Sequence, residues 1–135
     1  MNKEDLCFTP ATELAALIRA KEISPVEVID TVLERIEAIE PKINAFATLT
    51  ADRARDAARE AEAAVARGDD LGPLHGVPCT IKDLAEMAGV PAERGSFITK
   101  GEVPNFDTAL VVRLKEAGAI PLGKTTTSEF GWKGV

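Results

Sequence analysis

The chain has 135 residues, of which 45% are hydrophobic and 28% are charged, and its formal net charge at pH 7 is −6. This composition is typical of a soluble globular domain and excludes a disordered chain. The acidic balance argues against nucleic acid or an anionic membrane surface as the main partner, and no apolar run approaches the roughly 20 residues that span a bilayer.

The N-terminus lacks the apolar segment of a signal peptide. The two cysteines, Cys7 and Cys79, have neither the spacing of a disulfide framework nor that of metal ligands. We therefore expect reduced thiols, a cytoplasmic location, and neither a metal nor a cofactor. His75, the single histidine, is expected in a turn or at the edge of a pocket.

The first part of the chain, residues 1–70, is expected to be helical. Thr9 and Pro10 have the form of a helix cap followed by proline at the first helical position, which predicts a helix to about residue 21. Ser24, with proline next and glutamate three residues later, has the form of a capping box and predicts a second helix. We expect Pro41 to end that helix, because the residue before a proline avoids the helical region.

An extended link over residues 44–50 comes next, followed by an alanine-rich helix over about residues 51–67. Gly68 is expected to end this helix in the left-handed conformation.

Residues 71–135 have an α/β pattern. A strand over 77–82, a helix capped by Asp107 and closed by Gly118, and a short buried strand over 119–123 follow one another. Two strands joined by a crossover helix form a parallel βαβ unit. The expected fold class is therefore α/β, with N-terminal helices followed by a βαβ unit of a mixed sheet.

A long segment punctuated by Gly and Pro, residues 84–106, connects the first predicted strand to the predicted helix. Loops of more than about 15 residues are uncommon in compact domains and are often functional. We expect this segment to form the wall of a pocket, with room for a short strand or a turn of helix inside it.

Lys82 ends the first predicted strand, and ligands of open parallel sheets sit beyond the carboxyl ends of strands. Alternation along the strand points Lys82 and Asp83 to opposite faces, so Asp83 need not neutralise the lysine. A lysine held there away from water has its charged form disfavoured, and it can take a proton from a serine hydroxyl. The alternative is a lysine that ends a strand and reaches solvent.

Residues 72–84, GPLHGVPCTIKDL, resemble the segment that carries the catalytic lysine of the amidase signature family. The similarity continues in order along the chain, and residues 1–70 resemble the N-terminal helices of that family. The further matching segments are 88–91, 95–96, 107–114, 118–120, 123–125 and 128–130. The resemblance implies hydrolysis of a small-molecule amide by a Ser–cis-Ser–Lys triad, in which Lys82 would be the lysine.

The family's Gly/Ser-rich segment, which supplies the bridging serine and precedes the nucleophilic serine, has no counterpart in these residues. The serines are Ser24, Ser96 and Ser128, and none of them is adjacent to another. We therefore expect residues 1–135 to be the N-terminal portion of an amidase signature domain, helical over 1–70 and α/β over 71–135. Such a portion carries only the lysine and is expected to be inactive alone.

Three other functions stay open. Within the family, the chain could be part of the A subunit of a glutamyl-tRNA amidotransferase, although Glu93-Arg94-Gly95-Ser96 stands where that protein usually has Cys-Ala-Ser. Outside it, a non-catalytic interaction domain with an open sheet edge would self-associate.

The third alternative is a nucleotide-binding protein, because residues 118–125, GAIPLGKT, match the phosphate-loop pattern of such proteins. A helix precedes that motif and Pro121 removes one amide, so we expect Lys124 to line the cleft or to be capped by a neighbour.

Overall fold

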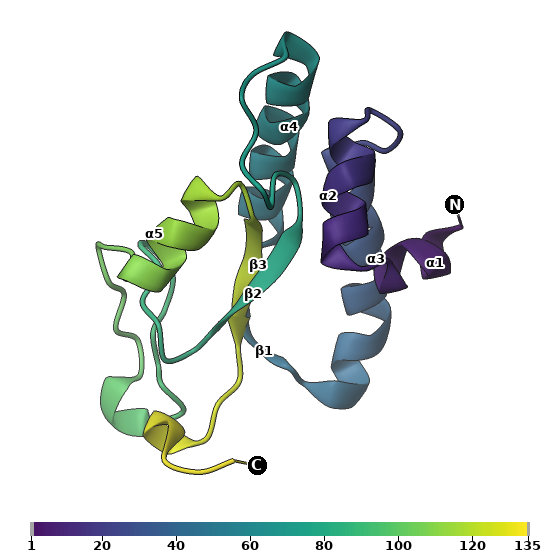
Figure 1. Cartoon of the computed structure of the whole chain (residues 1–135). Helices are drawn as coiled ribbons and strands as arrows, with labels where there is room; N and C mark the ends of the chain where they lie inside the picture. The colour runs from purple at the N-terminus through teal and green to yellow at the C-terminus, as the bar shows by residue number, and fades with distance from the viewer. Residues whose placement is uncertain (1, 135) are drawn as a thin grey trace.

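The computed structural model describes residues 2–134, in which helices pack on one side of a small sheet and a loop-rich layer covers the other side (Figure 1). The elements are the helices α1 (Lys3–Phe8), α2 (Ala11–Arg19), α3 (Pro25–Ile43), α4 (Ala51–Arg67) and α5 (Ala109–Glu116), the strands β1 (Phe46–Leu49), β2 (Pro78–Lys82) and β3 (Ile120–Thr125), and the 3-10 turns η1 (Phe97–Thr99) and η2 (Glu129–Gly131).

The ends of the two long helices follow the predicted capping residues. The Ser24 hydroxyl accepts hydrogen bonds from the amides of Val26 at 3.0 Å and Glu27 at 3.4 Å, and α3 starts at the next residue. Helix α4 ends at Gly68, which has a left-handed φ of 78°. Both caps satisfy backbone groups that a helix end otherwise leaves without partners, so these predictions are confirmed.

The start of the chain differs from the prediction. A short helix, α1, precedes the expected one, and Thr9 is its C-cap rather than the N-cap of the next helix. Asn2 caps α1 by accepting a hydrogen bond from the Asp5 amide at 2.8 Å. Pro10 then stands at the N-cap of α2 without a side-chain hydrogen bond. The cap signal at Asn2 was missed because it precedes only 6 helical residues.

Pro41 does not end α3, which continues to Ile43. The proline lies in the last turn, where its ring removes only one hydrogen bond of a long helix. The end is set by Asn44, which is left-handed at φ 48° and donates its amide to the Glu40 carbonyl. Asparagine tolerates this conformation better than most residues, so it acts as the stop signal.

The sheet has three strands in the order β1–β3–β2. Strands β2 and β3 are parallel, with α5 between them in sequence, which confirms the predicted βαβ unit. Strand β1 from the helical part pairs antiparallel with β3 and makes the sheet mixed. The carboxyl ends of β2 and β3 therefore meet at one edge, the place where α/β sheets bind ligands.

Separate apolar clusters hold the layers together. One lies between α3, α4 and β3, and it contains Ile29, Leu33, Ile36, Ala54, Ala58, Ala61, Ile120 and Leu122. A second joins α1, α2, α3 and the end of α4 to Val77, the residue before β2. The third packs α5 and the 84–106 segment on β2, and its buried members are Ile81, Met87, Val90 and Val111. The 84–106 segment is therefore anchored in the core and includes η1, the predicted turn of helix.

Asp107 has a different task from the predicted cap, because Thr108 is the N-cap residue of α5. The Asp107 carboxylate accepts the Ala88 amide at 2.8 Å and pairs with Lys115 at 2.6 Å. Burial opposes ionisation, but the hydrogen bonds from Lys115 and Ala88 outweigh it and lower the pKa of Asp107. Asp107 thus fastens the long segment to α5.

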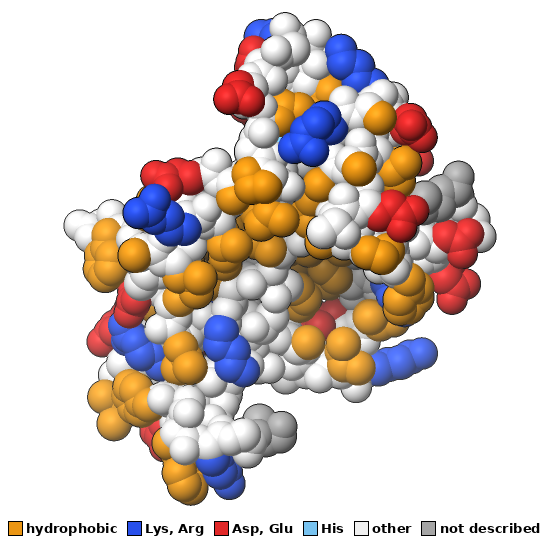
Figure 2. Space-filling model, in the orientation of Figure 1, with side chains coloured by type: hydrophobic (Ala, Val, Ile, Leu, Met, Phe, Trp, Pro, Cys, Tyr) orange, Lys and Arg blue, Asp and Glu red, His pale blue; other side chains and the backbone are white. Residues whose placement is uncertain are grey.

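Large apolar side chains also remain on the surface. Phe97, Ile98 and Trp132 are 91%, 82% and 73% exposed. Figure 2 shows further hydrophobic side chains gathered across the middle of one face of the molecule. Contiguous apolar surface of this kind marks places where a protein contacts other polypeptide or a ligand.

Candidate active site

A pocket of about 290 Å³ opens at the carboxyl ends of β2 and β3. Its wall combines the residue after β2, the middle of the 84–106 segment, and the residues after β3. The lining residues are Ala47, Asp83, Glu93, Gly95, Ser96, Phe97, Lys100, Thr126 and Thr127. The long segment therefore forms a pocket wall, as the sequence predicted.

Lys82 lies at the rim of this pocket. Its amine donates a hydrogen bond of 2.8 Å to the carbonyl of Thr126, one of the lining residues. The side chain is exposed, which contradicts the expectation that this lysine is dry within the chain. The reason is its position on β2: Ile81 and Asp83 are buried, and Lys82 between them points to the opposite face of the sheet, where the end of the strand is exposed.

The buried lysine of the site is instead Lys124 at the end of β3. Its amine lies 2.8 Å from a carboxylate oxygen of Asp83, and the two side chains are 0% and 3% exposed. This ion pair confirms that Asp83 does not neutralise Lys82 and that Lys124 is capped by a neighbour. The Asp83 carboxylate thus occupies the Lys124 amine as its ion-pair partner inside the fold.

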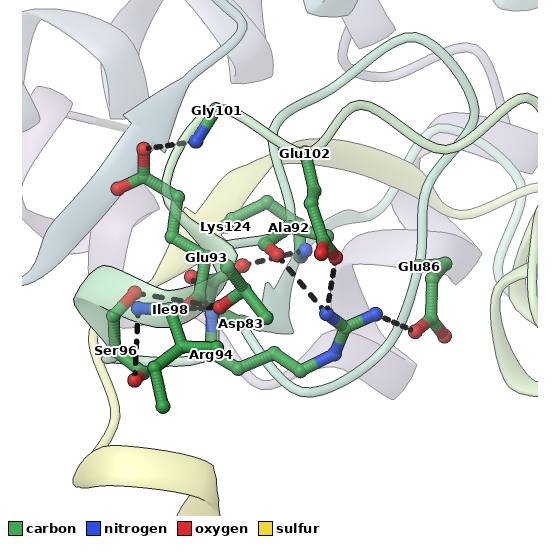
Figure 3. Close-up of polar contacts among 11 residues, drawn as sticks. Asp83, Glu86, Ala92, Glu93, Arg94, Ser96, Ile98, Gly101, Glu102 and Lys124 are labelled. Carbon is green, nitrogen blue, oxygen red and sulfur yellow. Dashed lines mark hydrogen bonds and ion pairs between the residues drawn. The ribbon is translucent and has the colours of Figure 1, made fainter.

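Arg94 is the hub of a second set of contacts in the pocket wall (Figure 3). Its amide donates to the other oxygen of Asp83 at 3.1 Å. Its guanidinium lies between two carboxylates, 2.6 Å from Glu86 and 2.9 Å from Glu102. The hydrogen bond from Arg94 lowers the pKa of Glu86, and the carboxylates raise the pKa of Arg94. Sequence reasoning missed this hub; an arginine inside a segment with acidic residues on both sides was the available signal.

The serine hydroxyls of the chain are all engaged away from Lys82. Ser24 donates to Glu62, Ser96 donates to Glu129 at 2.7 Å, and Ser128 donates to the Lys133 carbonyl at 2.7 Å. Within residues 2–134, the one buried side-chain oxygen or nitrogen without a hydrogen-bond partner is the hydroxyl of Thr127, in the pocket wall. The described residues therefore contain no serine–lysine pair.

The phosphate-loop pattern at residues 118–125 does not form a phosphate loop. Residues Ile120–Thr125 are strand β3, and the chain after them makes only the short turn η2. Gly118 closes α5 with a φ of 88°, close against the backbone of His75. His75 is half-buried in the turn before Gly76, and its ring hydrogen-bonds the Ala61 carbonyl at 2.9 Å. These positions match the structural roles that the sequence predicted.

Both cysteines are free, and burial raises the pKa of the Cys79 thiol. Over the described part of the chain, no three His, Cys, Asp or Glu side chains gather as metal ligands would. Among the same residues, none of the helices combines the length and apolarity needed to cross a bilayer.

Comparison with known proteins gives one consistent result. The sequence matches the family described as Amidase over residues 27–134. A relative is the A subunit of the glutamyl-tRNA(Gln) amidotransferase of Carboxydothermus hydrogenoformans, 45% identical over 126 residues, which are 93% of this chain and 26% of the relative. The chain thus spans about a quarter of the length of the curated relatives that it matches.

Solved structures agree with the relatives. A bacterial aryl acylamidase of the amidase signature family matches with a TM-score of 0.86 and 28% identity over 93% of this chain and 26% of its own. An inhibitor-bound chain from a vestigial protein complex, related to the origins of an s-triazine catabolic enzyme, matches with a TM-score of 0.88 and 35% identity over 92% of this chain and 27% of its own. The fold is therefore part of the amidase signature fold, and the chain belongs to the amidase family.

Proposed function

We propose that this chain supplies Lys82 to an amide-cleaving site of the Ser–cis-Ser–Lys type, whose two serines lie in polypeptide beyond these residues. The position of Lys82 carries the proposal: it ends β2 at the sheet edge where ligands bind, and its amine lies 2.8 Å from a carbonyl of the pocket rim. In this proposal, residues 1–135 are the N-terminal portion of one amidase signature domain in a cytoplasmic protein.

The chemistry assigns each group a task. An uncharged Lys82 amine takes the proton of the bridging serine, which in turn takes that of the nucleophilic serine. Added polypeptide that covers Lys82 would exclude water and favour the uncharged amine. A lone base supplies only a modest part of such catalysis, so the chain is expected to be inactive without the serines.

Two reactions share this amide cleavage. The first is hydrolysis of a small carboxamide to a carboxylate and ammonia or an amine. The second transfers the released ammonia to another acceptor, as the name of the amidotransferase relatives implies for those proteins. The curated relatives favour the second reaction, whereas Glu93-Arg94-Gly95-Ser96, in place of the expected Cys-Ala-Ser, favours the first.

A non-catalytic interaction domain is the other candidate, and the sheet supplies its observation. Strands β1 and β2 are the outer strands, so each presents one side without a partner strand in the described residues. Open edges of this kind pair with other strands and lead to self-association. Sedimentation velocity across a range of concentrations tests it, and a monomer at all concentrations would count against it.

The amidase proposal is tested with an extended protein, in which residues 1–135 are joined to the remaining part of the Carboxydothermus relative. Ammonia release from glutamine is measured for this protein and for its Lys82→Ala variant. We expect the variant to lose at least about 10³-fold in kcat. Lys42→Ala is the matched control, since Lys42 is an exposed lysine on α3 and should retain full activity. Equal activity of the Lys82 variant and the control would refute the proposal.

A further inference from the structure

The buried ion pair of Lys124 and Asp83 has no part in the proton transfers proposed above. Its amine and carboxylate are 2.8 Å apart and almost fully buried. Apolar residues of the same volume are often as stabilising as a buried pair, so stability alone does not account for two charges at this place.

The backbone of β3 is shaped to bring the pair together. Lys124 pairs with Ile81 across the β2–β3 ladder just after a register shift, so its side chain lies on the Ile81 side of the sheet, where Asp83 also points. Gly123 makes this course possible: its φ is 153°, and a Cβ there would lie 2.2 Å from the Thr48 carbonyl oxygen. At position 123, beside the register shift of β3, only glycine fits against β1.

Asp83 links the sheet to the pocket wall through its two carboxylate oxygens. One carboxylate oxygen accepts from Lys124 and the other accepts the Arg94 amide. Arg94 has a left-handed φ of 49°, a conformation that strains a non-glycine residue and persists only where several contacts impose it. The Arg94 amide donates to Asp83, and the Arg94 guanidinium pairs with two carboxylates. The Arg94 carbonyl accepts a hydrogen bond from the Phe130 amide at 2.8 Å.

The turn fixed in this way is the part of the wall that faces the pocket. Glu93, Gly95 and Ser96 line it on either side of Arg94 in sequence. Figure 3 shows Asp83 and Lys124 beside the turn that carries Arg94 and Ser96. A shift of the Asp83 carboxylate would therefore move the pocket wall relative to the strand end that carries Lys82.

We propose that Asp83 and Lys124 are positioning residues, which set the place of the turn at residues 93–96 over the pocket and so orient the amide substrate. This inference rests on the proposed function for its catalytic consequence, but its structural core does not. In this proposal Lys124 acts through Asp83, because its amine holds the Asp83 carboxylate in line with the Arg94 amide.

The structural core is tested on the full 135-residue chain by hydrogen–deuterium exchange. In the double variant Asp83→Asn/Lys124→Met, which leaves no buried ion unpaired, amides of residues 93–101 should exchange at least about tenfold faster, while those of α4 keep most of their protection. Lys42→Met is the matched control and should change neither segment. Unchanged exchange over 93–101, or an equal rise in α4, would overturn the inference.

A second variant covers the case in which the double variant does not fold. Asp83→Asn keeps the size of the side chain and an oxygen for the Arg94 amide, but it loses the charge that faces Lys124. Faster exchange confined to residues 93–101 in either variant supports the inference, and its absence from both overturns it.

The catalytic consequence is measured in the extended protein. We expect Lys124→Met to raise KM about tenfold or more, with the pH profile of kcat/KM unchanged, because the wall is displaced while the base is retained. A purely structural role would reduce the folded fraction and leave KM unaltered, which would contradict the inference. An extended protein without any activity would count against the proposed function alone, since the exchange experiment still decides the positioning role.

Discussion

A lysine lies near the carboxyl end of each of the two parallel strands, and the two lysines differ in burial and in hydrogen-bond partner. Lys82 at the end of β2 is exposed and donates to a backbone carbonyl, whereas Lys124 at the end of β3 is 0% exposed and paired with Asp83. The comparison teaches that burial does not by itself make a lysine a base. The partner and the position decide, because the Lys124 amine is held by a carboxylate at 2.8 Å inside the fold, whereas the Lys82 amine lies at an open edge where an incoming hydroxyl can reach it.

The largest effect on stability is expected where the buried pair is broken. Lys124→Met leaves the Asp83 carboxylate buried without its cation, so the free energy of unfolding should fall by about 3–5 kcal/mol. Urea denaturation followed by circular dichroism measures it. The double variant Asp83→Asn/Lys124→Met should recover much of the loss, and a single-variant loss below about 1 kcal/mol would mean that the pair is not buried in solution.

The bulge that delivers Lys124 gives the next largest effect. Gly123→Ala places a Cβ 2.2 Å from the Thr48 carbonyl oxygen at a φ of 153°, so we expect a loss of about 2–3 kcal/mol in the free energy of unfolding. Gly68→Ala is the matched control, since its φ of 78° is also unfavourable but no atom lies within 4 Å of the new Cβ. The control should lose only about 1 kcal/mol. Equal losses in the two variants would mean that the close approach of Gly123 to β1 does not exist in solution.

The ion pair between Arg94 and Glu86 predicts that the stability of the protein depends on pH. The hydrogen bond from Arg94 lowers the pKa of Glu86 below the ordinary 4.5, so the stability from ionised Glu86 is complete above about pH 4.5 and is lost as the pH falls through the lower folded-state pKa. Arg94→Gln should remove this part of the acid loss, about 1 kcal/mol. Thermal unfolding between about pH 3 and pH 7 measures it, and parallel curves for the two proteins would contradict it.

The smallest effect on stability is expected at Lys82. Its side chain is exposed, so Lys82→Ala should change the free energy of unfolding by no more than about 0.5 kcal/mol. The same urea titration as for Lys124→Met measures it. A loss as large as that of Lys124→Met would erase the distinction between the two strand ends.

Local signals in the sequence predicted much of the fold. The cap at Ser24 marks the start of α3, and the cap at Gly68 marks the end of α4. The apolar run before Lys82 and the helix closed by Gly118 predicted the βαβ unit. Pro41 misled because its position in the last turn costs the helix little, and the sequence does not rank it against Asn44 as a stop signal.

The site could be predicted only in part, since it depends on contacts between distant residues. The capping of Lys124 by a neighbour was predicted, but Asp83 could not be identified as that neighbour without the register shift beside Gly123. The Arg94 hub joins Asp83, Glu86 and Glu102, whose distances no local pattern fixes. The exposure of Lys82 follows from which elements cover each face of β2, and this too is a property of the assembled chain.

The most direct test of the account is a crystal structure of the extended protein, in which the serine-bearing segment is present beside residues 1–135. We expect the Lys82 amine to lie within about 2.6–3.2 Å of a serine hydroxyl from that segment, while Lys124 stays paired with Asp83. A structure in which Lys82 remains in solvent, or in which Lys124 contacts the serine in its place, would contradict it.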